Sequence, residues 1–486
     1  MKHNIQRRLN MIHIYRLSMN TLVICMLYML MPKNIEAQAS FIPLGIPEGT
    51  DASFATGVSD DGKYISLTVN ITPGGGSQAA YIWQQGIGFI ELTAAVELIN
   101  SGASDISGDG LILVGRHSYN WNHPDHGSLE TIEAFYSFGD TMISMGHGPG
   151  AFPSNTNNPP VSWTTATAIS RDGITIVGAM KDYVNRQGEP IPVLTQKGFY
   201  TQIGNTYQDM GVPISFEPWE VSIIPETVSD DGTIIAGFYE VPLNFITQAF
   251  RWESGVFEDL GDLPGGDVYS RVSDMSDDGE KIVGTSATAK GTEYFLWTRD
   301  TGIQPISGLS PTSSTSISIS GDGEIIVANQ DDGLYIVDSK NGARNLTAVL
   351  QNEYNIDLTG WSLRQVQDIS FDNYIMVGYG VNPDGKLEAF KIVLPVCPNL
   401  ETGRGTENWI NDSGGLFSNP DNWESREIPG DTSTVLIDVQ GDSIYTISYD
   451  GNITNEALAV KDTKVKFNLG GFDLTLLGAM INTFIF

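Results

Sequence analysis

The side chains best suited to ligand binding are aromatic rings in long, irregular segments between predicted strands. Exposed rings in such segments can stack on sugar rings or anchor a protein partner. These rings lie outside the repeat pattern described below, and they define the predicted ligand-binding site: Trp121, Trp163, Trp219, Trp361, Tyr119 and Tyr183. The alternative is that each ring folds back and holds its own segment in place.

A second group of residues has the chemistry of metal ligands. One aspartate lies among the histidines that follow residue 39, and together they form a possible site for a divalent cation: His117, His123, Asp125, His126 and His147. Imidazole and carboxylate groups bind such ions. However, the spacing matches no recognised zinc pattern, and a solvated polar loop explains the same residues. No other cofactor is expected.

The element that must position these residues is a repeat that begins at a tight turn. The turn reads Ser-x-Asp-Gly in six copies and Ser-Phe-Asp-Asn in the last, always after an apolar residue: Ser59, Ser107, Ser170, Ser229, Ser276, Ser320 and Ser370. Asp-Gly suits a hairpin turn because Gly accepts positive φ. We interpret the turns as structural, because they lack the spaced oxygen ligands of an EF-hand loop.

Each repeat predicts four short strands. An apolar pair follows the turn, and the position eight after the serine is Gly in most copies, which would let neighbouring backbone come close. The third strand carries a small residue and then an aromatic one, as in Ala249-Phe250 and Ala389-Phe390. The turn serines recur about every fifty residues. Strand repeats of this length predict an all-β fold, a seven-bladed β-propeller. An open β-solenoid is the alternative, and it would leave the end strands unpaired.

The repeats also resemble the HAF-type extracellular repeat of bacterial surface and secreted proteins. The residues that carry the resemblance are the Ser-x-Asp-Gly turns, the Gln248–Trp252 segment and the Leu260–Gly266 segment. The resemblance extends over residues 41–394, although Glu or Gln stands where the family has a leading His. It implies repeat architecture and an extracellular location but no particular activity.

The two ends of the chain differ from the repeats. Residues 1–39 read as a secretory signal peptide, with a basic start, a short apolar run from Leu22 to Met31 and a small-x-small cleavage site. The predicted propeller covers residues 40–395, and the strand Phe41–Gly45 would complete its last blade. Residues 396–408 read as a linker. Residues 409–486 resemble the start of a surface-protein parallel β-helix. A truncated form of a longer protein and a small β-sandwich are the two alternatives left open.

Charge and composition narrow the range of partners. The chain carries 58 acidic and 26 basic residues, a formal net charge of −32. Such a charge argues against nucleic acid or an anionic membrane as a partner. Cys397 is the one cysteine after the signal segment, so an internal disulfide is not expected. No transmembrane segment is expected after signal cleavage.

These observations predict a secreted or cell-surface protein that binds an extracellular glycan or protein through its long-loop face, in adhesion or matrix attachment. Short turns should occupy one face of the propeller and long segments the other, and binding residues usually lie on long segments held by a rigid scaffold. Two alternatives remain open. One is a polysaccharide-active hydrolase or lyase with His123 and nearby acids in a central funnel, and the other is a purely structural module.

Overall fold

The computed structural model describes residues 39–394 apart from Gly75 and the segments 124–126, 147–162, 185–192, 310–315 and 371–374. Beyond residue 405 it describes short strands and turns up to residue 482. The signal segment, Asp125, His126, His147 and most of the linker lie outside the described residues. Among the residues described, no helix is long and apolar enough to cross a membrane.

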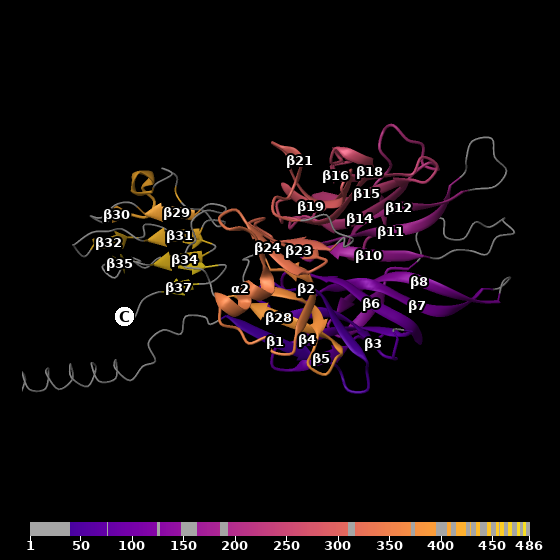
Figure 1. The fold of residues 1–486 in the computed structure, drawn as a ribbon, viewed down its shortest axis with the longest axis horizontal. Helices are drawn as coiled ribbons and strands as arrows, with labels where there is room; N and C mark the ends of the chain where they lie inside the picture. The colour runs from indigo at the N-terminus through magenta and orange to yellow at the C-terminus, as the bar shows by residue number, and fades with distance from the viewer. Residues whose placement is uncertain are drawn as a thin grey trace, which may run out of the picture.

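The repeats form antiparallel sheets of four strands each, numbered in chain order (Figure 1). The first three sheets are β2 (Ala52–Val58), β3 (Tyr64–Asn70), β4 (Gln78–Gln84) and β5 (Gly88–Glu91); β6 (Leu98–Ile106), β7 (Leu113–His123), β8 (Gly127–Phe138) and β9 (Thr141–Ser144); and β10 (Thr164–Ile169), β11 (Thr175–Val184), β12 (Val193–Gln202) and β13 (Gln208–Asp209).

The next three sheets follow the same order. They are β14 (Ser222–Val228), β15 (Ile234–Val241), β16 (Ile246–Glu253) and β17 (Val256–Gly261); β18 (Gly265–Met275), β19 (Lys281–Thr288), β20 (Gly291–Thr298) and β21 (Gly302–Pro305); and β22 (Ile317–Ile319), β23 (Ile325–Gln330), β24 (Gly333–Asp338) and β25 (Gly342–Asn345). One parallel bridge, between Thr247 of β16 and Tyr269 of β18, joins two neighbouring sheets.

The last sheet of the repeats combines the two ends of the region. It contains β26 (Ser362–Ile369), β27 (Ile375–Val381) and β28 (Leu387–Val393), and β1 (Ser40–Gly45) pairs antiparallel with β28. The N-terminal strand therefore occupies the fourth-strand place in a sheet whose other strands come more than 300 residues later. Figure 1 shows indigo β1 beside orange β28.

The sheets pack as in a β-propeller, with the first strand of each sheet beside the first strand of the next. This packing runs from β2 through β6, β10, β14, β18 and β22 to β26, and β26 in turn contacts β2. A recurring hydrogen bond joins adjacent sheets, since a third-strand backbone N–H donates to a first-strand hydroxyl. Ala249 N donates to Ser270 Oγ over 2.9 Å, and Ala389 N donates to Ser53 Oγ over the same distance.

Glycines eight residues after the turn serine let the strands of one sheet come close together, as the sequence predicts. A Cβ on Gly284 would lie 2.0 Å from Arg271 O and 2.8 Å from Phe295 Cζ. A Cβ on Gly178 would lie 2.0 Å from Thr165 O and 2.7 Å from Phe199 Cζ. The first strand and the third-strand aromatic ring therefore both close onto the glycine.

Two segments differ from the predicted loops. In two of the long segments that the sequence predicts between second and third strands, residues 116–132 and 179–197, the described residues are strand, because β7 pairs with β8 out to His123↔Gly127 and β11 pairs with β12 out to Val184↔Val193. Alternating β-branched and aromatic residues favour such extended pairing. The segment after β25 begins with a helix, α2 (Leu346–Asn352), which Asn345 caps by accepting from Ala348 N. Leu346, Val349 and Leu350 face the core with helical spacing.

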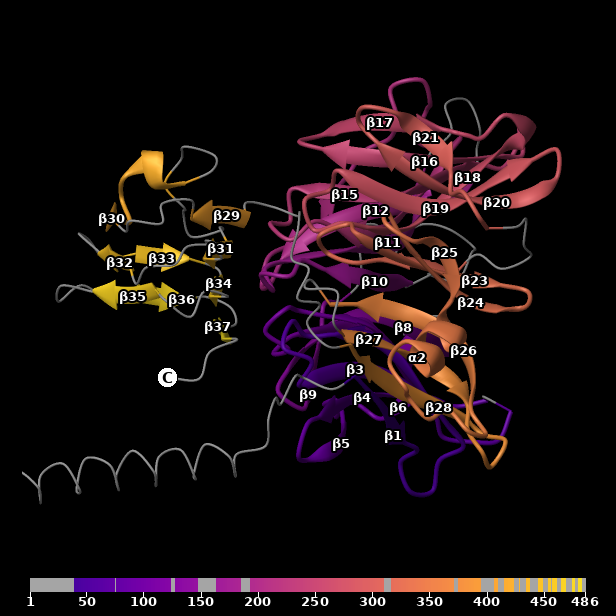
Figure 2. The same ribbon diagram turned by 60° about the vertical axis from the view of Figure 1, so that its left-hand side comes forward.

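The C-terminal region has parallel strand pairing. Its elements are β29 (Thr406–Trp409), β30 (Gly415–Leu416), a 3-10 turn (Pro420–Asn422), β31 (Thr434–Ile437), β32 (Tyr445–Ser448), β33 (Ile453–Asn455), β34 (Ala457–Val460), β35 (Val465–Asn468), β36 (Leu474–Leu476) and β37 (Met480–Asn482). They form three parallel stacks, β29-β31-β34-β37, β30-β32-β35 and β33-β36 (Figure 2). Buried Trp409, Phe417 and Trp423 pack edge to face at the first strands.

Candidate functional site: a polar central channel

The repeated serines are buried hydrogen-bonding centres of their turns. Ser276 Oγ donates to Asp278 Oδ1 over 2.6 Å and accepts from Lys281 N over 3.0 Å. Asp278 Oδ1 also accepts from Glu280 N over 3.0 Å. The same bonds recur at Ser59, Ser107, Ser170, Ser229 and Ser320. Because the aspartate and the serine satisfy backbone groups, the turn acids are structural, as the sequence predicts.

Backbone hydrogen bonds also link the six described turns to one another in chain order. Asp60 N donates to Gly108 O, and Gly108 N donates to Arg171 O, both over 2.9 Å. Farther along, Asp230 N donates to Asp277 O over 2.9 Å and Asp277 N to Gly321 O over 2.8 Å. The six described turns therefore form a lattice at one end of the channel between the first strands.

Arg171 lies within that lattice and reaches across it. It extends from the turn after β10, forms an ion pair with Asp60 of the turn after β2, and lies 3.6 Å (Nε to Oδ2) from Asp277 of the turn after β18. Burial acts to lower the pKa of Arg171, but the charges of Asp277, Asp60, Asp368 and Asp230 raise it by more. The guanidinium therefore remains charged. One arginine thus balances acids from several sheets.

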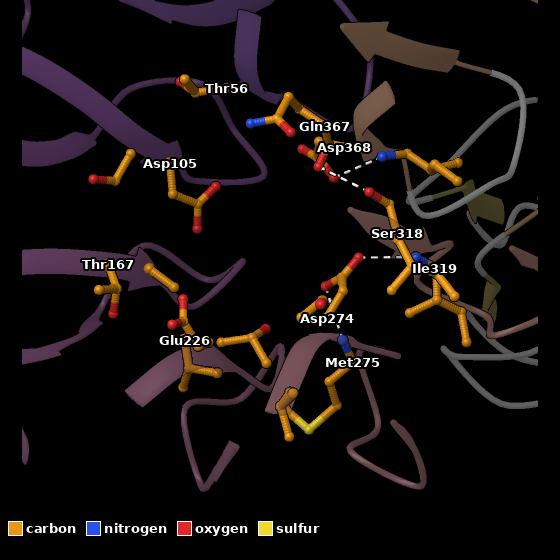
Figure 3. A pocket seen from close by; sticks show the side chains of 18 of the residues that line it. Thr56, Asp105, Thr167, Glu226, Asp274, Met275, Ser318, Ile319, Gln367 and Asp368 are labelled. Carbon is orange, nitrogen blue, oxygen red and sulfur yellow. Dashed lines mark hydrogen bonds between the residues drawn. The ribbon is translucent and has the colours of Figure 1, made fainter. Parts of the chain in front are cut away.

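A bulge near the end of most first strands turns a polar side chain into the channel. In each of these strands one residue is skipped in the pairing with the second strand: Thr56, Ser104, Thr167, Glu226, Ser273 and Gln367. All of them line one cavity of about 510 Å³. Bulges often re-aim side chains next to functional sites. Figure 3 shows Thr56, Thr167, Glu226 and Gln367 around a common open space.

Three further aspartates in the channel wall tie neighbouring sheets together. Asp274 accepts from Met275 N of its own strand over 2.8 Å and from Ile319 N of the next sheet over 2.9 Å (Figure 3). Asp105 bonds in the same way to Ile106 N and Ile169 N. Asp368 bonds to Ile369 N and to Val58 N, which belongs to the first sheet. Each carboxylate therefore bridges two first strands.

Burial makes these carboxyls unusually weak acids. It raises the pKa of Asp105 to about 6 and that of Asp368 to about 7, while the backbone hydrogen bonds act in the opposite direction. Burial raises the pKa of Asp274 well above its ordinary value. Asp277 also rises to a pKa of about 6 by burial, although Arg171 opposes the change. The channel therefore carries several protonatable groups near neutral pH.

Glu226 differs from the other channel acids. No hydrogen bond to its carboxylate is found in the part of the chain that the structure describes. Burial raises its pKa to about 7, while the charge of Arg271 acts to lower it. Arg271 stacks over the Phe238 ring, with Cζ 3.8 Å from the ring centroid. Thr285 lines the same cavity, is fully buried, and has a hydroxyl without a hydrogen-bond partner.

The predicted aromatic residues do not come together in one described cluster. Trp361 is partly buried, packing edge to face against Phe41 at 4.9 Å between ring centroids. Trp163 is partly buried, with Lys181 Nζ 5.0 Å from its ring centroid, and Trp219 is partly buried in the segment before β14. The backbones of Trp121 and Tyr183 lie on β7 and β11, but their side chains are outside the described set. None of the three described tryptophan rings lines the cavity.

The predicted metal ligands are only partly described. His117 is 3% exposed, and its Nε2 lies 3.8 Å from Oε2 of buried Glu133. The Tyr119 hydroxyl donates to Glu133 Oε1 over 2.9 Å, and the Ser144 hydroxyl donates to Oε2. Burial lowers the pKa of His117, although Glu133 opposes this. Across the residues that are described, no group of three or more His, Cys, Asp or Glu side chains is placed to hold a metal ion.

The channel residues carried a weak signal in the sequence. Asp105, Asp274 and Asp368 each stand two residues before a turn serine, whereas the other repeats have Gly57, Ala168, Thr227 or Ser318 there. An acid next to the apolar end of a strand is unusual enough to suggest a role. The bulge residues stand three positions before the turn serine and share only a small or polar side chain. Their common orientation into the channel depends on the pairing register of the first and second strands, which the sequence does not show.

Comparison with known proteins gives no family. No protein-family model matches the chain, and no curated protein matches it. The resemblance to HAF-type repeats therefore stays an expectation.

Solved structures give distant matches. TolB from Acinetobacter baumannii is 13% identical with a TM-score of 0.32, over 62% of this chain and 64% of that chain, so the match spans less than two thirds of that protein. An oligogalacturonate lyase from Vibrio parahaemolyticus is 11% identical with a TM-score of 0.47, over 74% and 97%. A prolyl endopeptidase is 13% identical with a TM-score of 0.42, over 80% and 57%. Likenesses at these scores carry no argument about this chain's activity.

Proposed function

We propose that this chain is a secreted or cell-surface protein whose repeats form a seven-bladed β-propeller closed by β1. The support for closure is that the links between consecutive sheets recur between the last and the first. Asp368 bonds to Val58 N as Asp274 bonds to Ile319 N, and Ala389 N bonds to Ser53 Oγ as Ala249 N bonds to Ser270 Oγ. The C-terminal stacks of parallel strands would be the first rungs of a β-helix.

The propeller, we infer, binds an extracellular glycan in its central channel. The observation that carries this proposal is the conserved geometry of the bulges, each of which gives up a strand pairing and places a polar side chain in one cavity. Hydroxyl, amide and carboxylate groups at the wall are the partners that sugar hydroxyls require. The long segments at the far end from the serine turns, with Trp163 and Trp219, would widen the binding surface.

The test applies a glycan-binding panel to the unchanged chain and to a variant whose channel is partly filled by a larger side chain. Thr167 is a bulge residue on the cavity wall, so Thr167→Trp should fill part of the cavity. We expect the unchanged chain to bind at least one class of glycan and Thr167→Trp to lose that binding. Gln85→Trp adds the same ring at an exposed turn and should bind normally. Equal binding by all three proteins, or no binding to any glycan, would contradict the proposal.

A second candidate function is a polysaccharide-active enzyme, and one observation favours it. Glu226 has a pKa near neutrality and lies in a polar cavity, as general acids and bases do. Release of oligosaccharides from a substrate panel by the unchanged chain, with loss in Glu226→Gln, would support this activity. A panel that yields no product, or equal release by the variant, would rule out Glu226 as its acid or base.

A further inference from the structure

The charge on the channel wall is strongly unbalanced. The cavity is lined by the carboxyls of Asp105, Glu226, Asp230, Asp274, Asp277 and Asp368, against the guanidinium groups of Arg171 and Arg271. A low-dielectric wall of one sign concentrates ligands of the opposite charge. Above about pH 7, where most of these carboxyls are ionised, an anionic glycan would meet repulsion at most positions along this channel.

Most of these carboxyls already have protein partners. Asp105, Asp274 and Asp368 each accept two backbone N–H groups, and Asp277 lies beside Arg171. Glu226 is different, because its carboxylate projects from a bulge into the open space (Figure 3) and lacks a hydrogen bond among the described residues. It is therefore the acid most available to a ligand.

The surroundings of Glu226 limit what else the ligand can contact. The Arg271 guanidinium carbon lies over the Phe238 ring, 3.8 Å from its centroid, so that ring face is covered and cannot stack on a sugar. The hydroxyl of buried Thr285, on the strand paired with that of Arg271, has no hydrogen-bond partner among the residues that the structure describes. This hydroxyl is a second group at the same end of the cavity that a polar ligand or an ordered water would satisfy.

We infer that the channel selects glycans that carry free amino groups, with Glu226 as the carboxylate that anchors the ammonium. The inference rests on the proposed function and adds the charge of the ligand and the residue that recognises this charge. A charge-assisted hydrogen bond between an ammonium and a carboxylate is among the stronger polar contacts in a partly buried site. Acidic glycans are correspondingly excluded.

The experiment compares two matched oligosaccharides by isothermal titration calorimetry at low salt. The trimer of glucosamine carries amines, and the trimer of N-acetylglucosamine has the same backbone with the amines blocked. We expect the amine trimer to bind about tenfold tighter or more, as one charge-assisted contact would give. Glu226→Gln should remove most of that preference, whereas Glu97→Gln, at an exposed loop position, should keep it.

The possible outcomes distinguish this inference from the proposed function, glycan binding in the channel, on which it rests. Equal affinity for the two trimers, or a preference that survives Glu226→Gln, would overturn the charge inference while the channel could still bind glycans. A panel on which a polyuronate binds best would overturn it as well. Failure to bind any glycan would overturn the proposed function itself. Because Gln is nearly isosteric with Glu, thermal unfolding of the variant checks that a loss of binding is not a loss of fold.

Discussion

At the scale of single residues, the close approach of neighbouring strands limits which side chains fit at the position eight after the turn serine. The glycine eight after the turn serine lies between a first-strand carbonyl and a third-strand ring, so it has no room for a Cβ. Leu67 and Ala328 occupy this place in two repeats, so those two sheets accommodate a Cβ there. The restriction is therefore local to each sheet, and a substitution tests it directly.

We expect Gly284→Ala to destabilise the fold severely. Its Cβ would lie 2.0 Å from Arg271 O, and relief requires β18 and the Phe295 ring to move apart. Overpacking of this kind costs about 1–3 kcal/mol or more in the free energy of unfolding. Denaturant unfolding measures it, and Gly76→Ala, whose nearest neighbour would be Thr72 Oγ1 at 3.5 Å, is the control. Equal stability of the two variants would refute the packing argument.

At the scale of elements, neighbouring sheets are held together by carboxylates that bridge first strands. Asp274 and Asp368 make equivalent bonds, but Asp274 joins two sheets adjacent in the chain and Asp368 joins the last sheet to the first. A closed ring should depend on both bridges to a similar extent. In an open solenoid, the Asp368 bridge would not exist.

We predict that Asp368→Ala and Asp274→Ala lower the free energy of unfolding by similar amounts. Each removes the acceptor of two buried backbone N–H groups, and an unsatisfied buried donor costs about 1–3 kcal/mol. Chemical denaturation gives the comparison, with Asp300→Ala at an exposed turn as the control for a lost charge. Destabilisation by the Asp274 variant with none by the Asp368 variant would argue against closure.

At the scale of the whole molecule, the buried acids couple the stability of the fold to pH. The folded-state pKa values of Asp105, Asp277, Asp368 and Glu226 lie at about 6 to 7, above the unfolded values of about 4. The native state then holds more protons than the unfolded state across this window. Stability must fall as pH rises from about 4 to 7, and remain lower above it.

We therefore expect the melting temperature to be higher at pH 5 than at pH 8. Groups with lowered pKa values, such as Asp61 and Asp231, act in the opposite direction but only below about pH 4. Differential scanning calorimetry across this range is the measurement. Asp368→Ala should show a shallower pH dependence, which separates the buried acids from general charge repulsion. A melting temperature that rises steadily from pH 5 to pH 8 would contradict this account.

Residues that repeat in the sequence predicted the repeated structure well. The serine turns, the glycine eight residues later and the Ala-aromatic third strand all follow from local rules of turn and strand chemistry. The channel could not be predicted in this way. Its wall is built from residues roughly fifty positions apart, and their shared orientation depends on a one-residue bulge in each strand. Arg171 illustrates the difficulty, since nothing in its short turn distinguishes it in the sequence, whereas the structure places it among acids of several sheets.

The most direct test of the central claim is to locate a bound glycan on the protein. A crystal structure or cryo-EM reconstruction with a glycan identified by the panel should show the sugar inside the channel. It should contact Glu226 and bulge residues such as Thr167 and Gln367. A sugar bound on the outer strands, or on the rings of the long segments with the channel free of sugar, would contradict the account.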